Sequence, residues 1–169
     1  ICGTGSNLGM ARIGEDVLSK NPDVVFVEFA VNDNYFNSEA VRTMEGIVRQ
    51  IHNKNADTKI VFVYTTVEEA KPTTVSYFKE LADSYNIYDI DLEEIVPGEK
   101  KDDTAIDSNG KTRHDYFADT IHPNTYGYKQ YADYIISVLD EALSRNVSDI
   151  PPLYVDVSSV SRIDITEDM

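Results

Sequence analysis

A chain of 169 residues with 41% hydrophobic content has the size of one domain and enough apolar residues for a core. Its 15 basic and 30 acidic residues give a net charge of −15, which opposes binding to nucleic acid and to anionic membrane surfaces. The single cysteine, Cys2, excludes an internal disulfide framework, and no apolar run is long enough to span a membrane. The compartment stays open, with a secreted protein favoured over a cytoplasmic one.

Strand-like and helix-like segments alternate along the chain. Residues 23–30 and 59–64 are β-branched and aromatic runs typical of strands buried on both faces of a parallel sheet, and residues 86–90 predict a weaker third strand. Apolar residues recur at helical spacing after Ser38, and further helices are predicted over residues 74–85 and from 125 to about 144. This order predicts an α/β fold with helices on both faces of a parallel sheet.

Three segments depart from this alternation. Residues 96–115 are rich in Lys, Asp, Gly and Ser, which predicts a long exposed loop. From residue 149 a Pro-Pro pair and an alternating pattern predict a linker or the start of a β-rich module, so we expect the main domain to cover residues 1–148. The chain opens without Met in a glycine-rich loop, and we expect a first strand upstream of Ile1.

Polar side chains that could carry chemistry follow the first strand and precede the last helix. Open α/β sheets bind ligands outside the carboxyl ends of their strands, where residues 30–34 are predicted to lie. The Asn32 amide and a backbone N–H at Gly3 could stabilise the same oxyanion. Asp119 precedes His122 by three residues and could hold the imidazole in one tautomer while its other nitrogen accepts a proton from a nucleophile. The pattern indicates a hydrolase site.

These segments resemble three conserved blocks of the SGNH hydrolases, also called GDSL-like lipases and acylhydrolases, and the resemblance runs from residue 1 to about 145. The matching blocks are Ile1 to Ser6, Ala30 to Asp33, where Ala replaces the usual Gly, and Asp119 to His122. The resemblance implies that Gly3 and Asn32 form the oxyanion hole and that Asp119 orients His122, the general base. The family's Gly-Asp-Ser block is absent from the 169 residues, so the resemblance places the nucleophilic serine upstream of Ile1.

The resemblance also implies a fold, a reaction and a substrate class. We expect a flavodoxin-like three-layer α/β/α sandwich that lacks its first strand. The implied activity is O-acyl ester hydrolysis through an acyl-enzyme, without cofactor or metal, on a small-molecule or polysaccharide ester. Carbohydrate deacetylation is our working hypothesis, with a lipase or lysophospholipase as the alternative. Without the serine the chain as written is expected to be inactive.

Other interpretations of the same residues stay open. The glycine spacing from Gly3 to Gly9, with Glu28 after the next strand, also fits a Rossmann-like nucleotide-binding loop. A catalytically dead module that binds carbohydrate or a partner is a further possibility. Ser6 lacks the Gly-x-Ser-x-Gly elbow, and we do not expect it to be the nucleophile. A metal site is a weaker alternative, and its candidate ligands are His114, Asp115, Asp119 and His122.

Overall fold

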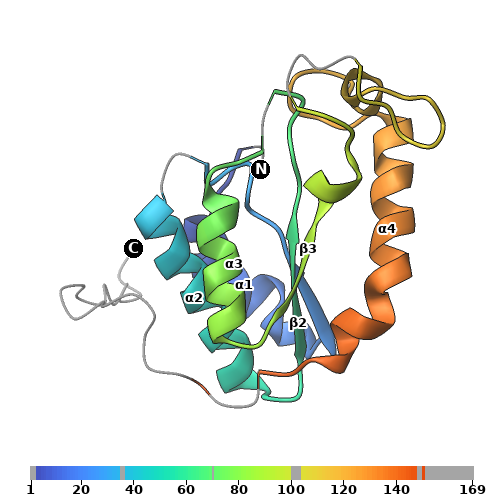
Figure 1. Ribbon diagram of the computed structural model, residues 1–169. Coiled ribbons are helices and arrows are strands. Elements are labelled where there is room, and N and C mark those ends of the chain that lie inside the picture. Colours follow the sequence, from blue (N-terminus) through green and yellow to red (C-terminus); the bar gives the residue numbers. More distant parts are fainter. Residues whose placement is uncertain (1–2, 35–36, 70, 100–103, 148–149, 151–169) are drawn as a thin grey trace.

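The computed structural model describes residues 3–34, 37–69, 71–99, 104–147 and 150 (Figure 1). Helices and parallel strands alternate along it, with three short 3-10 helices, which are labelled η. In chain order the elements are α1 (Ser6–Asp16), η1 (Leu18–Lys20), β1 (Val24–Val27), α2 (Asn37–Lys54), β2 (Lys59–Tyr64), α3 (Thr74–Ser84), β3 (Tyr88–Asp91), η2 (Leu92–Ile95), η3 (Arg113–Tyr116) and α4 (Thr125–Ser144).

The three strands form one parallel sheet in the order β1-β2-β3. Helices α1, α2 and α3 lie on one face and α4 lies on the other (Figure 1). Two apolar cores match these layers: Phe62 packs with Ile51 and Phe78 on the first face, whereas Val61 packs with Tyr131 of α4 on the second. The predicted α/β/α sandwich is therefore confirmed. No helix in the described part of the chain combines the length and apolar character of a membrane span.

Helix α1 was not predicted, because its glycines have low helix propensity and suggested a loop. The structure shows that glycine is needed at two positions where α1 packs closely against its neighbours, one in α1 and one in α2. A Cβ at Gly9 would lie 2.5 Å from the Phe29 ring, and a Cβ at Gly46 of α2 would lie 2.4 Å from the sulfur of Met10. The glycines therefore let α1 pack closely against the end of β1 and against α2.

Other differences from the predictions are small. β1 is shorter than the predicted residues 23–30, and β3 begins two residues later than predicted, whereas β2 has the predicted bounds. Residues 96–115 were expected to form an exposed loop, but they include the start of η3, where Arg113 is buried. Of the residues 149–169, predicted to be a linker or a β-rich module, only Ile150 is described, and it packs against the first core.

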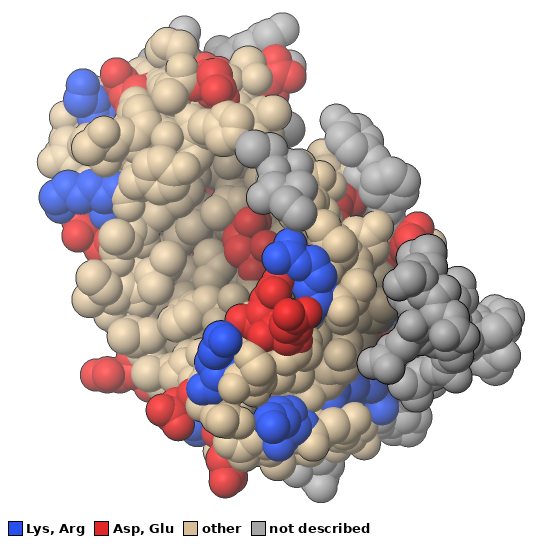
Figure 2. All heavy atoms as spheres, turned by 180° about the vertical axis from the view of Figure 1, so that it is seen from behind, with Lys and Arg blue, Asp and Glu red and all other residues tan. Residues whose placement is uncertain are grey.

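The outer edge of β1 has no strand partner among the described residues. Phe26 lies on the face of the sheet that α4 covers, because it pairs in register with Val61, yet Phe26 is 46% exposed. A largely apolar cavity of about 370 Å³ lies between α1 and this edge, lined by residues that include Leu8 and Val25. Viewed from the opposite side to Figure 1, this part of the surface is hollowed (Figure 2), and the lining also includes the charged residues Arg12, Asp16 and Glu28.

Candidate active site

Three of the four predicted site residues line one cavity of about 540 Å³. Gly3 precedes α1, Asn32 follows β1 and His122 precedes α4, so segments far apart in sequence meet at this point. Val67 and Glu69, which follow β2, line the cavity as well. The cavity therefore lies beyond the carboxyl ends of β1 and β2, where open α/β sheets bind ligands.

Asp119, the fourth predicted residue, contacts His122 directly. Its Oδ2 lies 2.9 Å from Nδ1 of His122, and its Oδ1 accepts hydrogen bonds from the backbone N–H groups of His122 (2.7 Å) and Ile121 (2.8 Å). The hydrogen bonds from the His122 backbone, the His122 ring and the Ile121 backbone lower the pKa of Asp119 to about 2. Asp119 is therefore a carboxylate at neutral pH and can hold the proton on Nδ1, which leaves Nε2 to accept and donate protons.

The turn that carries this pair is narrow and is held from two sides. Phe117 and Pro123 form an antiparallel bridge, and the Ala118 N–H donates to the His122 carbonyl at 2.8 Å. At the tip, the Glu68 N–H donates to the carbonyl of Thr120 at 3.1 Å. The loop after β2 therefore supports the turn whose side chains are largely exposed, with 68% exposure for His122 and 58% for Asp119.

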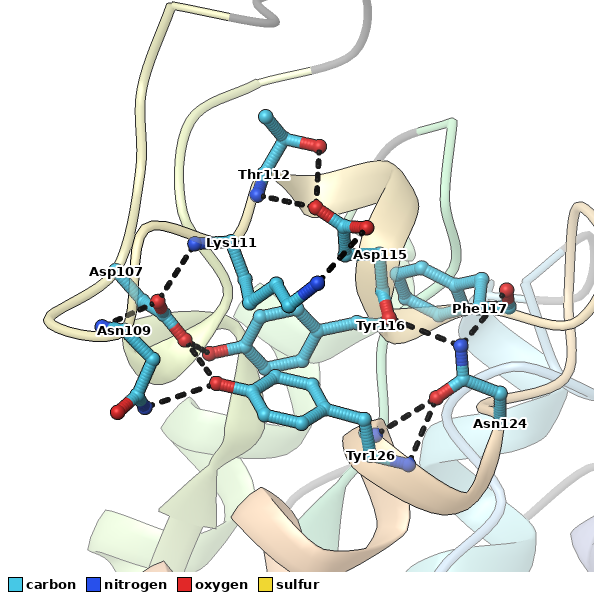
Figure 3. Close-up of polar contacts among 10 residues, drawn as sticks. Asp107, Asn109, Lys111, Thr112, Asp115, Tyr116, Phe117, Asn124 and Tyr126 are labelled. Atoms are coloured by element: carbon cyan, nitrogen blue, oxygen red, sulfur yellow. Dashed lines mark hydrogen bonds and ion pairs between the residues drawn. The ribbon is translucent and has the colours of Figure 1, made fainter.

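Asn124 joins the base of the turn to the start of α4 (Figure 3). Its side-chain oxygen caps the helix by accepting from the N–H groups of Tyr126 (2.9 Å) and Gly127 (3.1 Å). Its amide donates to the carbonyls of Asp115 (2.9 Å) and Phe117 (3.2 Å). Both lone pairs and both protons of this amide are used, so the turn keeps a fixed orientation relative to α4.

Asp107 fixes the same region from the preceding loop (Figure 3). Its carboxylate accepts hydrogen bonds from the hydroxyls of Tyr116 and Tyr126 and from the backbone N–H groups of Asn109 (2.8 Å) and Lys111 (2.9 Å). Desolvation raises the pKa of Asp107, but the hydrogen bonds, from Tyr126 first, outweigh it and lower the pKa to about 2. Asp107 therefore stays ionised and joins the loop to Tyr116 and Tyr126, on either side of the turn that carries Asp119 and His122.

Arg113 is 3% exposed and joins the loop after β2 to the 3-10 helix η2. Its guanidinium bonds both carboxylate oxygens of Glu93 at 2.9 Å and donates to the carbonyls of Val67 (2.7 Å) and Glu68 (2.8 Å). A planar guanidinium satisfies such a set of acceptors in one fixed geometry. Arg113 thereby holds the segment whose Glu68 N–H contacts the tip of the turn that carries Asp119 and His122.

A model of the GDSL-like Lipase/Acylhydrolase family matches residues 1–130. The chain belongs to this family. The matched range includes Gly3, Asn32 and His122, the residues that line the 540 Å³ cavity. Among curated protein sequences, none matches this chain significantly.

Solved structures of esterases share the fold. A two-domain esterase (CEX) active on acetylated mannans, co-crystallized with mannopentaose, superposes with a TM-score of 0.71 and 26% identity over 92% of this chain and 40% of that chain. An acetyl xylan esterase, AlAXEase, matches with a TM-score of 0.65 and 22% identity over 82% of this chain and 78% of that chain. A GDSL-like lipase from Bacteroides thetaiotaomicron matches with a TM-score of 0.62 and 17% identity over 83% and 73% of the two chains. This GDSL-like chain thus spans less than half the length of the two-domain esterase.

The geometry also bears on the nucleotide-binding alternative. In a Rossmann-like site the N-terminus of the helix after the glycine loop binds the pyrophosphate. Here the N–H of Ser6, at the start of α1, already donates to the Asp33 carboxylate at 3.0 Å. Glu28, the candidate ribose ligand, accepts from the Thr65 hydroxyl at 2.8 Å and from the Ala30 N–H at 3.0 Å. These contacts, together with family membership, argue against a nucleotide site.

The structure does not support Ser6 as the nucleophile or the candidate metal site. The Ser6 hydroxyl is buried against that of Thr43 and is not part of the lining of the 540 Å³ cavity. In the described residues no three His, Cys, Asp or Glu side chains are arranged to hold a metal ion, and His114 pairs with Glu68 while His122 pairs with Asp119. The supporting residues Asp107 and Arg113 were missed, because only their tertiary contacts distinguish them from ordinary polar loop residues.

Proposed function

We propose that this GDSL-like chain is the acyl-ester-hydrolysing part of a carbohydrate O-deacetylase. The observation that carries the proposal is the single cavity lined by Gly3, Asn32 and His122, with Asp119 bonded to the His122 ring. An ester hydrolase needs a base for the nucleophile and donors for the developing oxyanion in one place. These residues supply both functions.

The proposed mechanism is that of a serine esterase. His122 accepts the proton of a serine as its hydroxyl attacks the ester carbonyl and then donates that proton to the departing alcohol, and a water molecule later releases the acyl group. Asp119 stabilises the imidazolium that forms in between. The N–H of Gly3 and the amide of Asn32 bind the oxyanion. Gly3 has φ +66°, in the left-handed region that favours glycine.

The serine is proposed to lie on a segment that precedes Ile1, because the 169 residues contain no Gly-Asp-Ser. Two features support this placement: the edge of β1 that has no partner in the described residues, and the apolar cavity of about 370 Å³ beside it. A strand added to this edge in parallel would end beside Asn32, at the carboxyl edge of the sheet. We call the protein with this segment the intact enzyme.

The lining of the active-site cavity supports a short acyl group. Its polar members include Asn32, Asn34, Glu69 and Thr120, whereas its apolar side chains are Val31, Val67 and Ile121. A long acyl chain would need a much larger apolar surface to offset its transfer from water. The activity of the 26% identical two-domain esterase on acetylated mannans supports the same substrate class.

The test is acetate release by the intact enzyme from acetylated mannan and acetylated xylan, beside a series of aryl esters of increasing acyl length. We expect acetate release from the polysaccharides and a kcat/KM that falls steadily with acyl length. A preference for long acyl chains would instead identify a lipase or lysophospholipase. If the intact enzyme binds these polysaccharides but hydrolyses none of the esters, the chain belongs to a binding module.

A further inference from the structure

Asp33 lies beside the proposed oxyanion hole without lining the cavity that Gly3, Asn32 and His122 share. Its side chain is 4% exposed, and its carboxylate accepts from the Ser6 N–H through both oxygens, at 3.0 and 3.3 Å. The backbone N–H of Asp33 donates to the Phe29 carbonyl at 2.9 Å. The residue is therefore fixed at its backbone to the end of β1 and at its side chain to the start of α1.

The contact between Asp33 and Ser6 joins the two segments that supply the oxyanion donors. Asn32 is the neighbour of Asp33 in the chain, and Gly3 lies three residues before Ser6. Both donors reach one cavity although 29 residues separate them in sequence. The carboxylate bridges the segments directly beside these donors.

The first N–H of helix α1, that of Ser6, depends on Asp33 for its acceptor, whereas the N–H of Leu8 donates to the side chain of Asn7 at 2.7 Å. The N-cap residue, Gly5, has no side chain that could accept from the first helical N–H groups, and the distant carboxylate takes this place. Gly5 also leaves room for it, because a Cβ there would lie 2.2 Å from Oδ1 of Asp33. The negative charge at the helix N-terminus adds a favourable interaction with the helix dipole.

We propose that Asp33 is a positioning residue that sets the separation of the Gly3 N–H and the Asn32 amide, and so the geometry of the oxyanion hole. The proposal rests on the function proposed above. An oxyanion hole works through donors fixed in advance at the position of the developing charge. A displacement of about 1 Å in such a constellation can cost about a hundredfold in rate. Loss of the bridge should therefore slow turnover more than it weakens substrate binding.

The test compares Asp33→Ala and Asp33→Asn with Thr43→Val in the intact enzyme. Asn keeps an oxygen that can accept from Ser6, whereas Ala removes the bridge. Thr43 is the matched control, because its hydroxyl is buried at the same junction of α1 and α2 but, among the described residues, hydrogen-bonds to the Ser6 hydroxyl and to backbone carbonyls of α2 and not to Asp33. We expect Asp33→Ala to lower kcat by at least about tenfold with KM within about twofold, Asp33→Asn to restore most of kcat, and Thr43→Val to retain kcat.

Equal losses of kcat in Asp33→Ala and Thr43→Val at equal thermal stability would overturn the proposal, as would full kcat in Asp33→Ala. If Asp33→Ala does not fold, Gly5→Ala displaces the carboxylate instead, and the same comparison with Thr43→Val applies. If the wild-type enzyme hydrolyses no ester, the proposed function fails separately. The positioning role of Asp33 is then tested by the amide signals of Gly3 and Asn32 in NMR spectra. We expect these signals to shift in Asp33→Ala and to return to their wild-type positions in Asp33→Asn. Signals that do not change in Asp33→Ala would refute the positioning role.

Discussion

The two sides of the active-site cavity are built in different ways. On the Asn32 side, the adjacent residue Asp33 is almost fully buried, at 4% exposure. Its carboxylate accepts a hydrogen bond from Ser6 at the start of α1, 27 residues away in sequence. On the other side, His122 and Asp119, the proposed catalytic pair, are 68% and 58% exposed and are held by hydrogen bonds within a short turn. The Asn32 side is therefore fixed by a long-range contact. The His122 side is fixed by contacts within the turn, which Asn124 and the loop after β2 support.

The difference shows how one site can combine rigidity with access. A histidine that exchanges protons with substrate and water must be accessible to both. Its orientation therefore comes from Asp119 and from the hydrogen bonds that anchor the two ends of the turn. Oxyanion donors must keep their positions as charge develops, and buried contacts provide this at the cost of solvent access. We therefore expect substitutions of the exposed pair to lower activity with little change in stability, and substitutions of the buried residue Asp33 to change both.

The largest expected effect is on the exposed side. Replacing His122 with Ala in the intact enzyme should lower kcat by about 10⁴, because the base is lost, while Tm stays within a few degrees of wild type. Steady-state acetate release and thermal melts measure the two quantities. A variant that retained a tenth of wild-type kcat would remove His122 from the mechanism.

A smaller loss is expected across the cavity. Asn32→Ala should raise the barrier by about 3 kcal/mol, a loss of roughly a hundredfold or more in kcat, because one oxyanion donor is removed. Since Asn32 is itself exposed, its Tm should change little, in contrast to substitutions at Asp33. Wild-type turnover in Asn32→Ala would contradict the assignment of the oxyanion hole.

Substitution of Asp107, which supports the turn, should lower the free energy of unfolding. Asp107→Ala leaves the hydroxyl of Tyr116, a residue 1% exposed, without its carboxylate acceptor, which should destabilise the protein by about 1–3 kcal/mol. Chemical denaturation monitored by tyrosine fluorescence measures this loss. Unchanged stability would show that the loop before η3 does not hold the turn.

The same carboxylate predicts a dependence on acid. Its pKa is lowered from 3.8 to about 2 in the folded protein, so its contribution to stability is complete above pH 4 and is lost as the pH falls towards 2. The difference in unfolding free energy between wild type and Asp107→Asn should therefore shrink over this range. A difference that is constant between pH 5 and pH 2 would disprove this linkage.

The smallest effect is expected at the second histidine–carboxylate pair. His114 contacts Glu68 much as His122 contacts Asp119, but it does not line the cavity. His114→Ala should change kcat by less than about twofold. A loss comparable to that of His122→Ala would show that exposure and pairing with a carboxylate do not distinguish the catalytic histidine.

Sequence patterns predicted those parts of the fold that depend on local composition. The continuous apolar run at Lys59–Tyr64 and the capped helix at Thr125–Ser144 have the bounds that were predicted. Helix α1 was missed because its glycines serve close packing against Phe29 and Asp33, which lie elsewhere in the chain. Tertiary packing here outweighs helix propensity.

The predicted site residues came from motif order, and the structure brings Gly3, Asn32 and His122 to one cavity. The residues that support them could not be predicted in the same way. Arg113 and Asp107 lie in a polar segment whose composition indicates an exposed loop. Their roles depend on partners in the loop after β2, on η2 and on α4, which no local pattern specifies. Burial of such polar groups is decided by the geometry of their hydrogen bonds.

The proposed esterase activity and the role of His122 are tested most directly by acetate release from acetylated mannan, measured in parallel for the intact wild-type enzyme, His122→Ala and His114→Ala. We expect wild type and His114→Ala to release acetate at similar rates and His122→Ala to release almost none. Equal release by all three proteins, or none by a folded wild type, would contradict this expectation.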